Sequence, residues 1–454
     1  MKINERKYRH LVTGAAGWLL LGLLTLWYGI IWWRYYADAI IAPFFRRGNW
    51  VVVLIYTVLT ALVFQVYRCF RFGYLRRSDL VYYQLTGIVL VNFITYFQIS
   101  VIGRRFMAVS PVVLLTGLDF VTIALWSSLI GRLYFRLYPP RKLAVVYGSE
   151  DAAALVMKMS SRVDKYMICE SVSCAGGFRR ITEVIGQFDG VILCDLPLPL
   201  RDRLLKYCCG RRIRTYTVPE ISDILLRGGE ELRLFDTPLI LSRNEGLTLT
   251  QRVVKRCFDL AVSGILLVLL SPVLGICAAA VRFGDGGCVF YHQKRLTKDG
   301  KVFEILKLRS MKPDAEADGV AVLAAEHDDR ITRVGRVLRR FRLDELPQLI
   351  NILKGDMSLV GPRPERPELH AEYAKECPEF DYRLQVKAGL TGYAQVFGAY
   401  DTAPVDKLKM DLLYIEQYNV LLDLRILLMT IKTAVIPPQS NEAQQESVQN
   451  RRKD

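Results

Sequence analysis

The sequence predicts a membrane protein in three parts: a bundle of four membrane-spanning helices, a small α/β module, and a mainly α-helical domain that carries the chemistry. Three observations support this prediction. Apolar runs fill the first third of the 454 residues, strand-like and helix-like segments alternate in the middle, and arginine-rich motifs follow. About 20 apolar residues suffice to cross a bilayer, and alternating strands and helices are typical of a parallel sheet.

The composition excludes several classes of protein. With 52% hydrophobic residues the chain is too apolar to be disordered, and its length excludes a small secreted domain. The net charge of +16, together with the apolar runs, favours contact with anionic lipid headgroups over nucleic-acid binding. The ten cysteines include no CxxC pair, which indicates reduced thiols. None of the four histidines stands at metal-ligand spacing, so we expect no structural zinc site.

The four candidate spans occupy residues 11–33, 51–67, 81–103 and 112–131 of a bundle assigned to residues 1–140. The first run is too long for a cleaved signal and is followed at once by further spans. Asp119 lies in the middle of the fourth span and is expected to face a neighbouring helix. The alternative interpretation is a functional acid within the membrane.

The distribution of Lys and Arg predicts the orientation of this bundle. The N-terminal segment, the second connection and the segment after the fourth span each carry four such residues, against three and two in the other connections. By the positive-inside rule, both ends of the bundle therefore lie in the cytoplasm.

Residues 141–245 are expected to form a Rossmann-like α/β module. Strands are predicted at 143–148, 166–171, 191–194 and 215–218, with a helix over 151–160. A dinucleotide-binding turn would need GxGxxG after the first strand, whereas this chain has Gly148-Ser-Glu150-Asp-Ala-Ala. One glycine of three, and a carboxylate at Glu150, favour a scaffold that binds no cofactor over a nucleotide site.

A fifth apolar run, residues 260–281, is the centre of a helix predicted over 258–283. Its length is that of a span, but Ser271 and Pro272 lie at its middle, and proline kinks a helix because it removes a hydrogen bond. Two interpretations follow from the residues. Either the run is a kinked fifth span that carries the next domain outside, or it enters one leaflet, bends and returns.

The segment from 250 to 436 is basic and dense in motifs, and its arginines come from separate motifs. Planar guanidinium groups match phosphate oxygens, so several together suit a diphosphate. The alternative is a solvated basic surface, which is our interpretation of the helically spaced arginines within 333–340. The residues that we assign to substrate binding are Lys307, Arg309, Arg339, Arg363, Arg383, Gln395 and Asp411.

Asp344-Glu345 is the most specific local feature. The apolar spacing from 343 to 353 predicts an amphipathic helix, and Pro347 is tolerated only in a first turn, so both acids are expected at the helix N-terminus. The structural alternative makes Asp344 an N-cap and Glu345 a first-turn acid. Because the chain shows no catalytic Ser-His or Cys-His arrangement and no Walker loop, Asp344 is the plausible nucleophile at phosphorus, with Glu345 available to hold Mg²⁺.

Three long strings carry a family resemblance: LRRFRLDELPQ at 338–348, KGDMSLVGPRPE at 354–365 and GLTGYAQV at 389–396. The segment 250–436 resembles the bacterial sugar transferases, the polyisoprenyl-phosphate hexose-1-phosphate transferases, in their large multi-span form. The resemblance implies a membrane helix that re-enters at Ser271-Pro272, Asp344 as the catalytic nucleophile, and Glu345 as catalytic acid at the Mg²⁺. The chain departs from the family pattern at Gly287-Cys288 and Ala388-Gly389, where the family commonly has Gly-Pro and Pro-Gly.

The resemblance further implies a reaction. A UDP-hexose would give its hexose-1-phosphate to undecaprenyl phosphate through a covalent aspartyl-phosphosugar, releasing UMP and starting exopolysaccharide, capsule or O-antigen synthesis. The enzyme would lie in the bacterial inner membrane with its catalytic domain in the cytoplasm. Two alternatives remain open: direct attack by the lipid phosphate, and a membrane-anchored nucleotide-sensing regulator with an inactive transferase domain. The hexose is not encoded in any local motif, and a homo-oligomer is left open.

The last segment, residues 437–454, is rich in Gln, Ser and Asn and contains few apolar residues. We expect it to be a disordered tail.

Overall fold

The computed structural model describes residues 2–41, 43–44, 47–70, 72–73, 75, 77–149, 152–160, 162–285, 287–312, 328, 330–398 and 402–435. The tail predicted at 437–454 and the carboxylate of Glu150 lie outside these residues. The chain divides into two compact units, Met1–Val218 and Pro219–Asp454. Residues 219–245, which the sequence analysis placed in the middle module, belong to the second unit.

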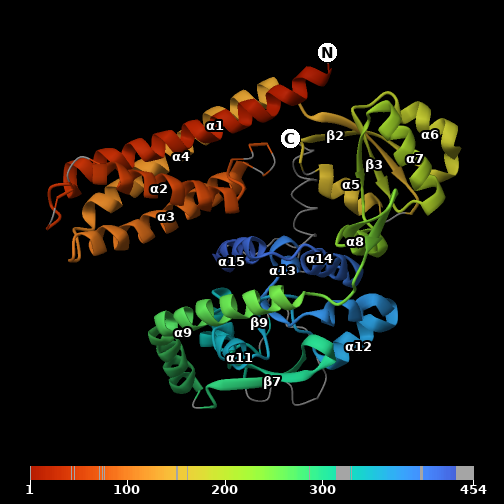
Figure 1. Ribbon diagram of the computed structural model, residues 1–454. Helices are drawn as coiled ribbons and strands as arrows, with labels where there is room; N and C mark the ends of the chain where they lie inside the picture. Colours follow the sequence, from red (N-terminus) through yellow and green to blue (C-terminus); the bar gives the residue numbers. More distant parts are fainter. Residues whose placement is uncertain are drawn as a thin grey trace. The chain divides into compact units, whose positions relative to one another are not determined.

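Four long helices form the first part of the first unit (Figure 1). They are α1 (Lys2–Ile31), which continues into a π-turn η1 (Trp32–Tyr36), α2 (Arg47–Val66), α3 (Arg77–Ile102) and α4 (Ser110–Leu137). Each is long and apolar enough to cross a membrane. Asp119 is fully buried on α4 and accepts a hydrogen bond of 2.9 Å from Asn92 Nδ2 of α3, so it faces a neighbouring helix as predicted.

The rest of the first unit is a parallel sheet flanked by helices. Its strands lie in the order β2-β1-β3-β4, and alternate residues of β1 face two separate apolar clusters, Val146 with Leu193 on one side and Val145 with Ile192 on the other. Burial on both faces explains why these strands read as continuous apolar runs. The elements are β1 (Arg141–Tyr147), α5 (Ala152–Ser160), β2 (Tyr166–Ser173), η2 (Cys174–Gly176), α6 (Gly177–Ile185), β3 (Gly190–Cys194), α7 (Leu198–Arg211) and β4 (Arg214–Thr217).

Gly148, the one glycine of the expected phosphate-binding turn that is present, has a packing role. A β-carbon at this position would collide with the backbone oxygen of Asp195, at the end of β3. The glycine therefore allows two neighbouring strand ends to approach each other. This requirement accounts for Gly148 without a bound phosphate.

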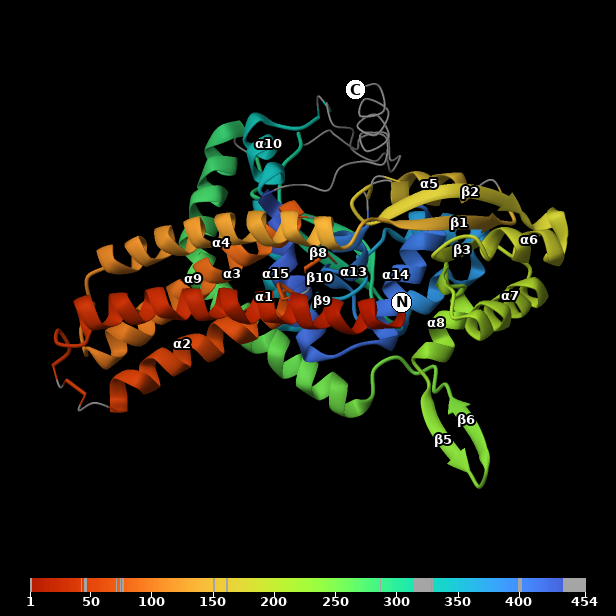
Figure 2. The same ribbon diagram turned by 90° about the horizontal axis from the view of Figure 1, so that it is seen from above.

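The second unit begins with α8 (Ile221–Arg227) and an antiparallel hairpin of β5 (Glu230–Leu234) and β6 (Thr237–Leu241). Figure 2 shows this hairpin standing clear of the other elements of the unit. The remaining elements surround one large apolar core. They are α9 (Leu249–Asp285), β7 (Phe290–Leu296), η3 (Lys298–Gly300), β8 (Val302–Leu308), α10 (Arg333–Arg340), η4 (Leu343–Glu345), α11 (Gln348–Lys354), β9 (Ser358–Val360), α12 (Pro367–Glu376), η5 (Pro378–Gln385), β10 (Gly389–Thr391), α13 (Tyr393–Phe397), α14 (Pro404–Glu416) and α15 (Val420–Val435).

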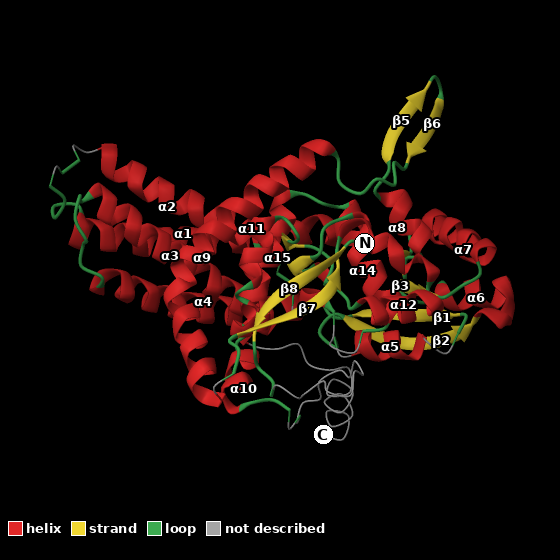
Figure 3. Ribbon diagram, turned by 90° about the horizontal axis from the view of Figure 1, so that it is seen from below, coloured by secondary structure: helices red, strands yellow, loops and turns green. Residues whose placement is uncertain are grey.

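Two small pairs of strands support this unit. β7 and β8 form an antiparallel hairpin, which is seen along its length in Figure 3. β9 and β10 pair in parallel, so the segments that follow them, residues 361–365 and 392 onward, leave the same end of this short ladder. The parallel pair thus places the second and third of the quoted motifs beside each other.

Helix α9 contains the fifth apolar run and changes direction along its course (Figure 1). Pro272 lies inside it, and Ser271 Oγ donates a hydrogen bond of 2.8 Å to Val268 O, which accounts for the bend. The first arm packs Phe258 against the large core, and the second arm packs Val281 against Leu338 of α10. Both arms therefore return to the same folded unit, whereas a straight helix of 37 residues would separate its ends by about 55 Å.

Candidate active site

Asp344 and Glu345 lie in the short 3₁₀ turn η4, between α10 and α11. Arg342 enters this turn with a positive φ of 54°, and α11 begins only at Gln348, after Pro347. The acids thus lie in a 3₁₀ turn directly before α11, and Leu346 and Pro347 keep right-handed helical angles between the two elements. No side chain caps α11, so Asp344 is not its N-cap.

The two carboxylates have different partners. Glu345 Oε1 lies 3.3 Å from Lys307 Nζ and 3.5 Å from Arg363 Nη2. Among the described residues, Asp344 forms no ion pair. Two of the predicted substrate-binding residues therefore meet at Glu345 and leave the Asp344 carboxylate available.

The pKa values of this cluster follow from burial and charge. Burial opposes ionisation of Glu345, but Lys307, Arg363 and Arg342 outweigh it and hold its pKa at about 2. Burial and the adjacent charge of Glu345 raise the pKa of Asp344 above its ordinary value, although Lys307 and Arg339 act in the opposite direction. Burial lowers the pKa of Lys307. Glu345 is thus a fixed anion, while Asp344 and Lys307 respond to pH.

Arg363 projects from the GPRPE loop, residues 361–365, whose backbone carbonyl groups are hydrogen-bonded to neighbouring segments. Four consecutive carbonyl oxygens of this loop accept hydrogen bonds, which leaves the loop little freedom to move. The bonds run from Gly389 N to Pro362 O (2.9 Å), Arg383 Nη2 to Arg363 O (2.9 Å), Arg295 Nη1 to Pro364 O (3.1 Å) and Leu296 N to Glu365 O (3.0 Å).

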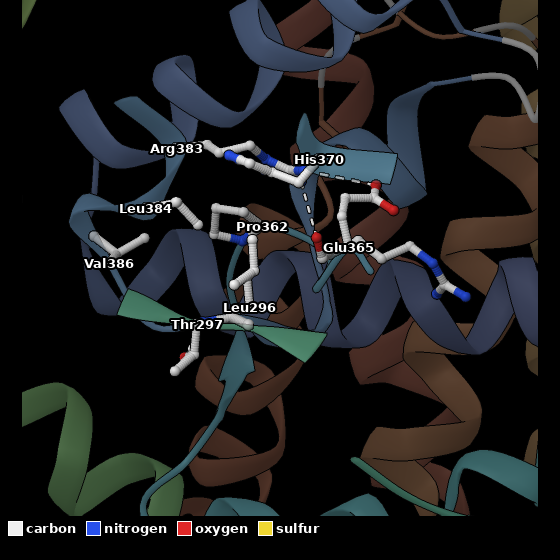
Figure 4. A pocket seen from close by; sticks show the side chains of 10 residues that line it. Leu296, Thr297, Pro362, Glu365, His370, Arg383, Leu384 and Val386 are labelled. Carbon is white, nitrogen blue, oxygen red and sulfur yellow. Dashed lines mark hydrogen bonds and ion pairs between the residues drawn. The ribbon is translucent and has the colours of Figure 1, made fainter. Parts of the chain in front are cut away.

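Arg383 and Asp411 lie behind this loop in a buried ion network. Both are almost fully buried, and Arg383 Nη2 lies 2.8 Å from Asp411 Oδ2. Figure 4 shows Arg383 reaching towards Glu365, whose carboxylate also pairs with Lys407 at 2.6 Å. This placement favours a role in positioning Arg363 over the direct substrate contact predicted from the sequence.

Arg295 is a site residue that the sequence analysis missed. It lies on β7, donates to Pro364 O and to Gln293 Oε1 (2.6 Å), and is close enough to Arg363 for the two charges to repel. Burial and this repulsion lower the pKa of Arg295 to about 10. The signal was available in the QKR string at 293–295, but nothing in the local sequence links that string to the GPRPE loop.

The remaining predicted residues lie on separate elements of the second unit. Arg339 lies in the last turn of α10 and acts electrostatically on Asp344. The backbone of Arg309 donates to Val289 O (2.9 Å), and its guanidinium packs against Gly287. Gln395 lies on α13, where both polar atoms of its amide are buried and find no hydrogen-bond partner among the described residues.

The carboxylates of Asp344 and Glu345 are compatible with a Mg²⁺ ion that has only one or two protein ligands. No group of three or more His, Cys, Asp or Glu side chains with metal-site geometry occurs among the described residues. Mg²⁺, however, is commonly bound by one or two carboxylates, with water and substrate phosphate oxygens completing the octahedron. Asp344 and Glu345 supply that minimal set of hard oxygen donors.

A half-buried acid pair among cationic side chains, beside a bent apolar helix, defines a membrane enzyme that handles phosphate groups. The family model for bacterial sugar transferases matches residues 250–437. A UDP-N-acetylgalactosamine-undecaprenyl-phosphate N-acetylgalactosaminephosphotransferase of Aeromonas hydrophila is 31% identical over 382 residues, which cover 78% of this chain and 84% of that protein. The chain therefore belongs to the bacterial sugar transferase family and is a transferase associated with the membrane.

Two further relatives differ in how much of each chain they cover. A UDP-glucose:undecaprenyl-phosphate glucose-1-phosphate transferase of Escherichia coli K12 is 38% identical, over 45% of this chain and 44% of its own length. The exopolysaccharide production protein ExoY of Rhizobium meliloti is 37% identical, over 39% of this chain and 83% of its own length. Most of ExoY thus matches a segment that makes up well under half of this chain.

Proposed function

We propose that this protein transfers a hexose-1-phosphate from a UDP-hexose to undecaprenyl phosphate, releases UMP and so initiates the synthesis of an exopolysaccharide, capsule or O-antigen. The observation that carries the proposal is the division of roles at η4. Glu345 is held by two cations, while its neighbour Asp344 has no ion-pair partner in the described part of the chain. The names of the relatives supply the substrate classes.

The first step uses Asp344 as the nucleophile. The diphosphate of the donor lies against Lys307 and Arg363, with Arg309 and Arg339 as further predicted contacts. An Asp344 oxygen attacks the phosphorus that bears the sugar, the bond between this phosphorus and the bridging oxygen breaks, and UMP leaves with that oxygen. Fixed cations favour this step because negative charge moves onto the leaving phosphate.

The second step regenerates the enzyme. An oxygen of the polyprenyl phosphate attacks the phosphorus of the aspartyl-phosphosugar, and the electron pair of the broken bond returns to the Asp344 carboxylate. The product is a polyprenyl diphosphate sugar. Splitting the transfer in this way lets the soluble donor and the lipid acceptor react at different times.

Mg²⁺, which we propose as the cofactor, would be held by Glu345 with Asp344 nearby, and it would neutralise charge on the diphosphate. Lys307 and Arg363 keep the Glu345 carboxylate ionised and oriented for this role.

We also propose that α9 is re-entrant and that the catalytic domain lies on the cytoplasmic face of the inner membrane. The bend, the exposed apolar side chains along α9 and the return of both arms to one unit support this placement. The soluble UDP-sugar is available on that face.

The proposal is tested by UMP release from detergent-solubilised protein with Mg²⁺, undecaprenyl phosphate and a panel of UDP-glucose, UDP-galactose and UDP-N-acetylgalactosamine. Wild type should release UMP with at least one donor, and Asp344→Asn should lose at least about 10³-fold of the rate because its amide cannot form the acyl phosphate. Asp299→Asn, an exposed Asp→Asn change in the same unit, should retain activity. UMP release by Asp344→Asn at the wild-type rate would remove Asp344 as the nucleophile, and no release with any donor would favour the nucleotide-sensing regulator.

A further inference from the structure

A second basic cavity lies at the start of α9, apart from the pair of acids. Its volume is about 420 Å³. Five cationic side chains line it, against one acid, and apolar groups make up most of the rest. The lining residues that matter here are Arg252, Lys255, Arg256, Lys298, Lys387 and Asp259.

Most of these cations have neutral partners. Arg256 donates to the carbonyls of Ile352 (2.6 Å) and Leu353 (2.9 Å), and Lys387 donates to that of Gly355 (2.6 Å). Arg252 likewise donates to backbone carbonyls, and in the described part of the chain none of these three forms an ion pair. Carbonyl oxygens orient a cation without neutralising it, so the cavity retains net positive charge.

The cations of the cavity outnumber the acids nearby. Asp423 pairs with Lys255 at 2.6 Å, and Asp259 accepts hydrogen bonds from Ser358 Oγ (2.7 Å) and from Leu359 N (3.1 Å). Among the described residues, Lys298 pairs only with the exposed Asp299, at 3.7 Å. Burial and the charge of Arg256 lower the pKa of Lys387, against the opposing effect of Asp259 and Asp356.

Arg256 and Lys387 converge near Gly355, and a buried polar atom of Gln385 without a hydrogen-bond partner among the described residues lines the same cavity. Arg256 Nη2 and Lys387 Nζ would lie 3.4 and 3.7 Å from a β-carbon at Gly355, whose φ of +101° also requires glycine. Gln385 lines the cavity, and its Oε1 is buried without a hydrogen-bond partner among the described residues. A bound group that carries both an anionic oxygen and a hydroxyl would complete this set.

The cavity lies at the level where α9 enters the membrane. Arg256 precedes Leu260, the first residue of the apolar run, by four residues, a rise of about 6 Å. The next two turns expose Ile265 (60%) and Val268 (73%). Lipid phosphates lie just outside the hydrocarbon core, so a cavity next to the start of the apolar run can reach them whether α9 re-enters or spans.

We propose that this cavity binds the headgroup of an anionic phospholipid of the membrane in which α9 lies. The headgroup phosphate lies against Arg256, Lys387 and Lys298, and the acyl chains follow the exposed apolar side of α9. The site is distinct from the catalytic one: Ser358, at the start of β9, lines the cavity, whereas Arg363 follows the end of that strand. The lipid anchors the catalytic unit to the membrane surface and is not consumed.

The test uses the full chain in detergent and the variant Gln385→Glu, which adds an isosteric carboxylate to the cavity. Unfolding of the second unit is followed by maleimide labelling of buried Cys377. We expect phosphatidylglycerol, added to the detergent micelles at about ten times its dissociation constant, to raise the midpoint temperature of unfolding by roughly 3–6 °C in wild type. Phosphatidylcholine should have no effect. Gln385→Glu should raise the midpoint without lipid and abolish the phosphatidylglycerol increment, because its carboxylate replaces the anion.

Control variants and alternative ligands distinguish lipid binding in this cavity from other causes of a change in the midpoint temperature. Gln417→Glu makes the same change on an exposed residue outside the cavity and should keep the full lipid increment. Lys298→Gln should reduce the increment without preventing folding. The proposal is overturned if Gln385→Glu keeps the increment, if phosphatidylcholine gives an equal one, or if inorganic phosphate alone reproduces it, which would indicate a soluble ligand. UMP release, measured in parallel, reports the transferase reaction separately from lipid binding.

Discussion

At the residue scale, two adjacent carboxylates differ because their neighbours differ. Glu345 meets Lys307 and Arg363, which keep it ionised, and Asp344 faces no cation within ion-pair distance among the described residues. In the proposed mechanism the nucleophile has to reach the donor phosphorus and the second acid has to stay in place, and the contacts of the two carboxylates are compatible with these roles. The order of Asp344 and Glu345 in the sequence does not by itself determine which of them has which role.

The first prediction concerns pH. The pKa of Asp344 is raised and that of Lys307 is lowered, so the rate should fall on the acid side as Asp344 becomes protonated and on the alkaline side as Lys307 loses its charge. Because arginine stays protonated, Lys307→Arg should move the alkaline limb to higher pH and leave the acid limb in place. An unchanged alkaline limb in the pH–rate profile of Lys307→Arg would exclude Lys307 as its source.

The second prediction concerns Arg383. Its fork holds Arg363 O and Asp411 together, so Arg383→Lys keeps the charge but loses one of these bonds. We expect kcat to fall by about 10–100-fold with a smaller change in KM, since a misplaced Arg363 costs most in the transition state. Lys409→Gln, which removes a pair with the half-exposed Glu220, is the matched control and should have little effect. A rise in KM alone would return Arg383 to direct substrate binding.

Sequence reasoning at this scale is most informative where the motif is local. LDELPQ and GPRPE each supply candidate site residues in consecutive positions, and the structure brings Glu345 and Arg363 of these two motifs together. Arg295 was missed, and Arg383 lies behind the GPRPE loop, because both act through backbone carbonyls of that loop, far away in sequence. Such contacts have no local pattern.

At the element scale, the course of α9 determines how the second unit contacts the membrane. The apolar run predicted its presence, and Ser271-Pro272 predicted the bend. The run could not distinguish re-entry from spanning, because that depends on where the two arms pack. The predicted helix starts at the acids as a 3₁₀ turn and becomes an α-helix only at Gln348, a change of hydrogen-bond pattern that apolar periodicity does not reveal.

The third prediction uses two exposed cysteines, Cys257 before the apolar run and Cys288 after it. If α9 re-enters, single-cysteine variants that keep only one of them should both react with a membrane-impermeant maleimide from the cytoplasmic side. A third variant, which keeps only exposed Cys209 of the first unit, provides the reference for the side that the positive-inside rule predicts to be cytoplasmic. Labelling of Cys257 and Cys288 from opposite sides, in right-side-out and inverted vesicles, would show that α9 spans.

At the scale of the whole molecule, the chain divides at Val218 rather than near 245. The packing of Ile221, Ile224 and Leu225 of α8 into the core of the second unit assigns this segment. The order of the parts was predictable from hydropathy and strand patterns, whereas this membership depends on contacts between residues about 190 positions apart.

The fourth prediction follows from this division. The second unit has its own core and both arms of α9, and the bacterial sugar transferase family model matches residues 250–437 within it. A fragment of residues 219–454 should therefore fold in detergent and release UMP within about tenfold of the full-length rate. Loss of activity with retained folding would assign the first unit a direct part in the reaction.

The most direct test of the central claim is the mass of the intact protein after incubation with its UDP-sugar and Mg²⁺ in the absence of lipid acceptor. The account predicts one added hexose phosphate, mapped to Asp344, which disappears when undecaprenyl phosphate is supplied and never forms on Asp344→Asn. An active enzyme that stays unmodified, and that forms UMP only when lipid is present, would contradict the covalent intermediate and favour direct attack by the lipid phosphate.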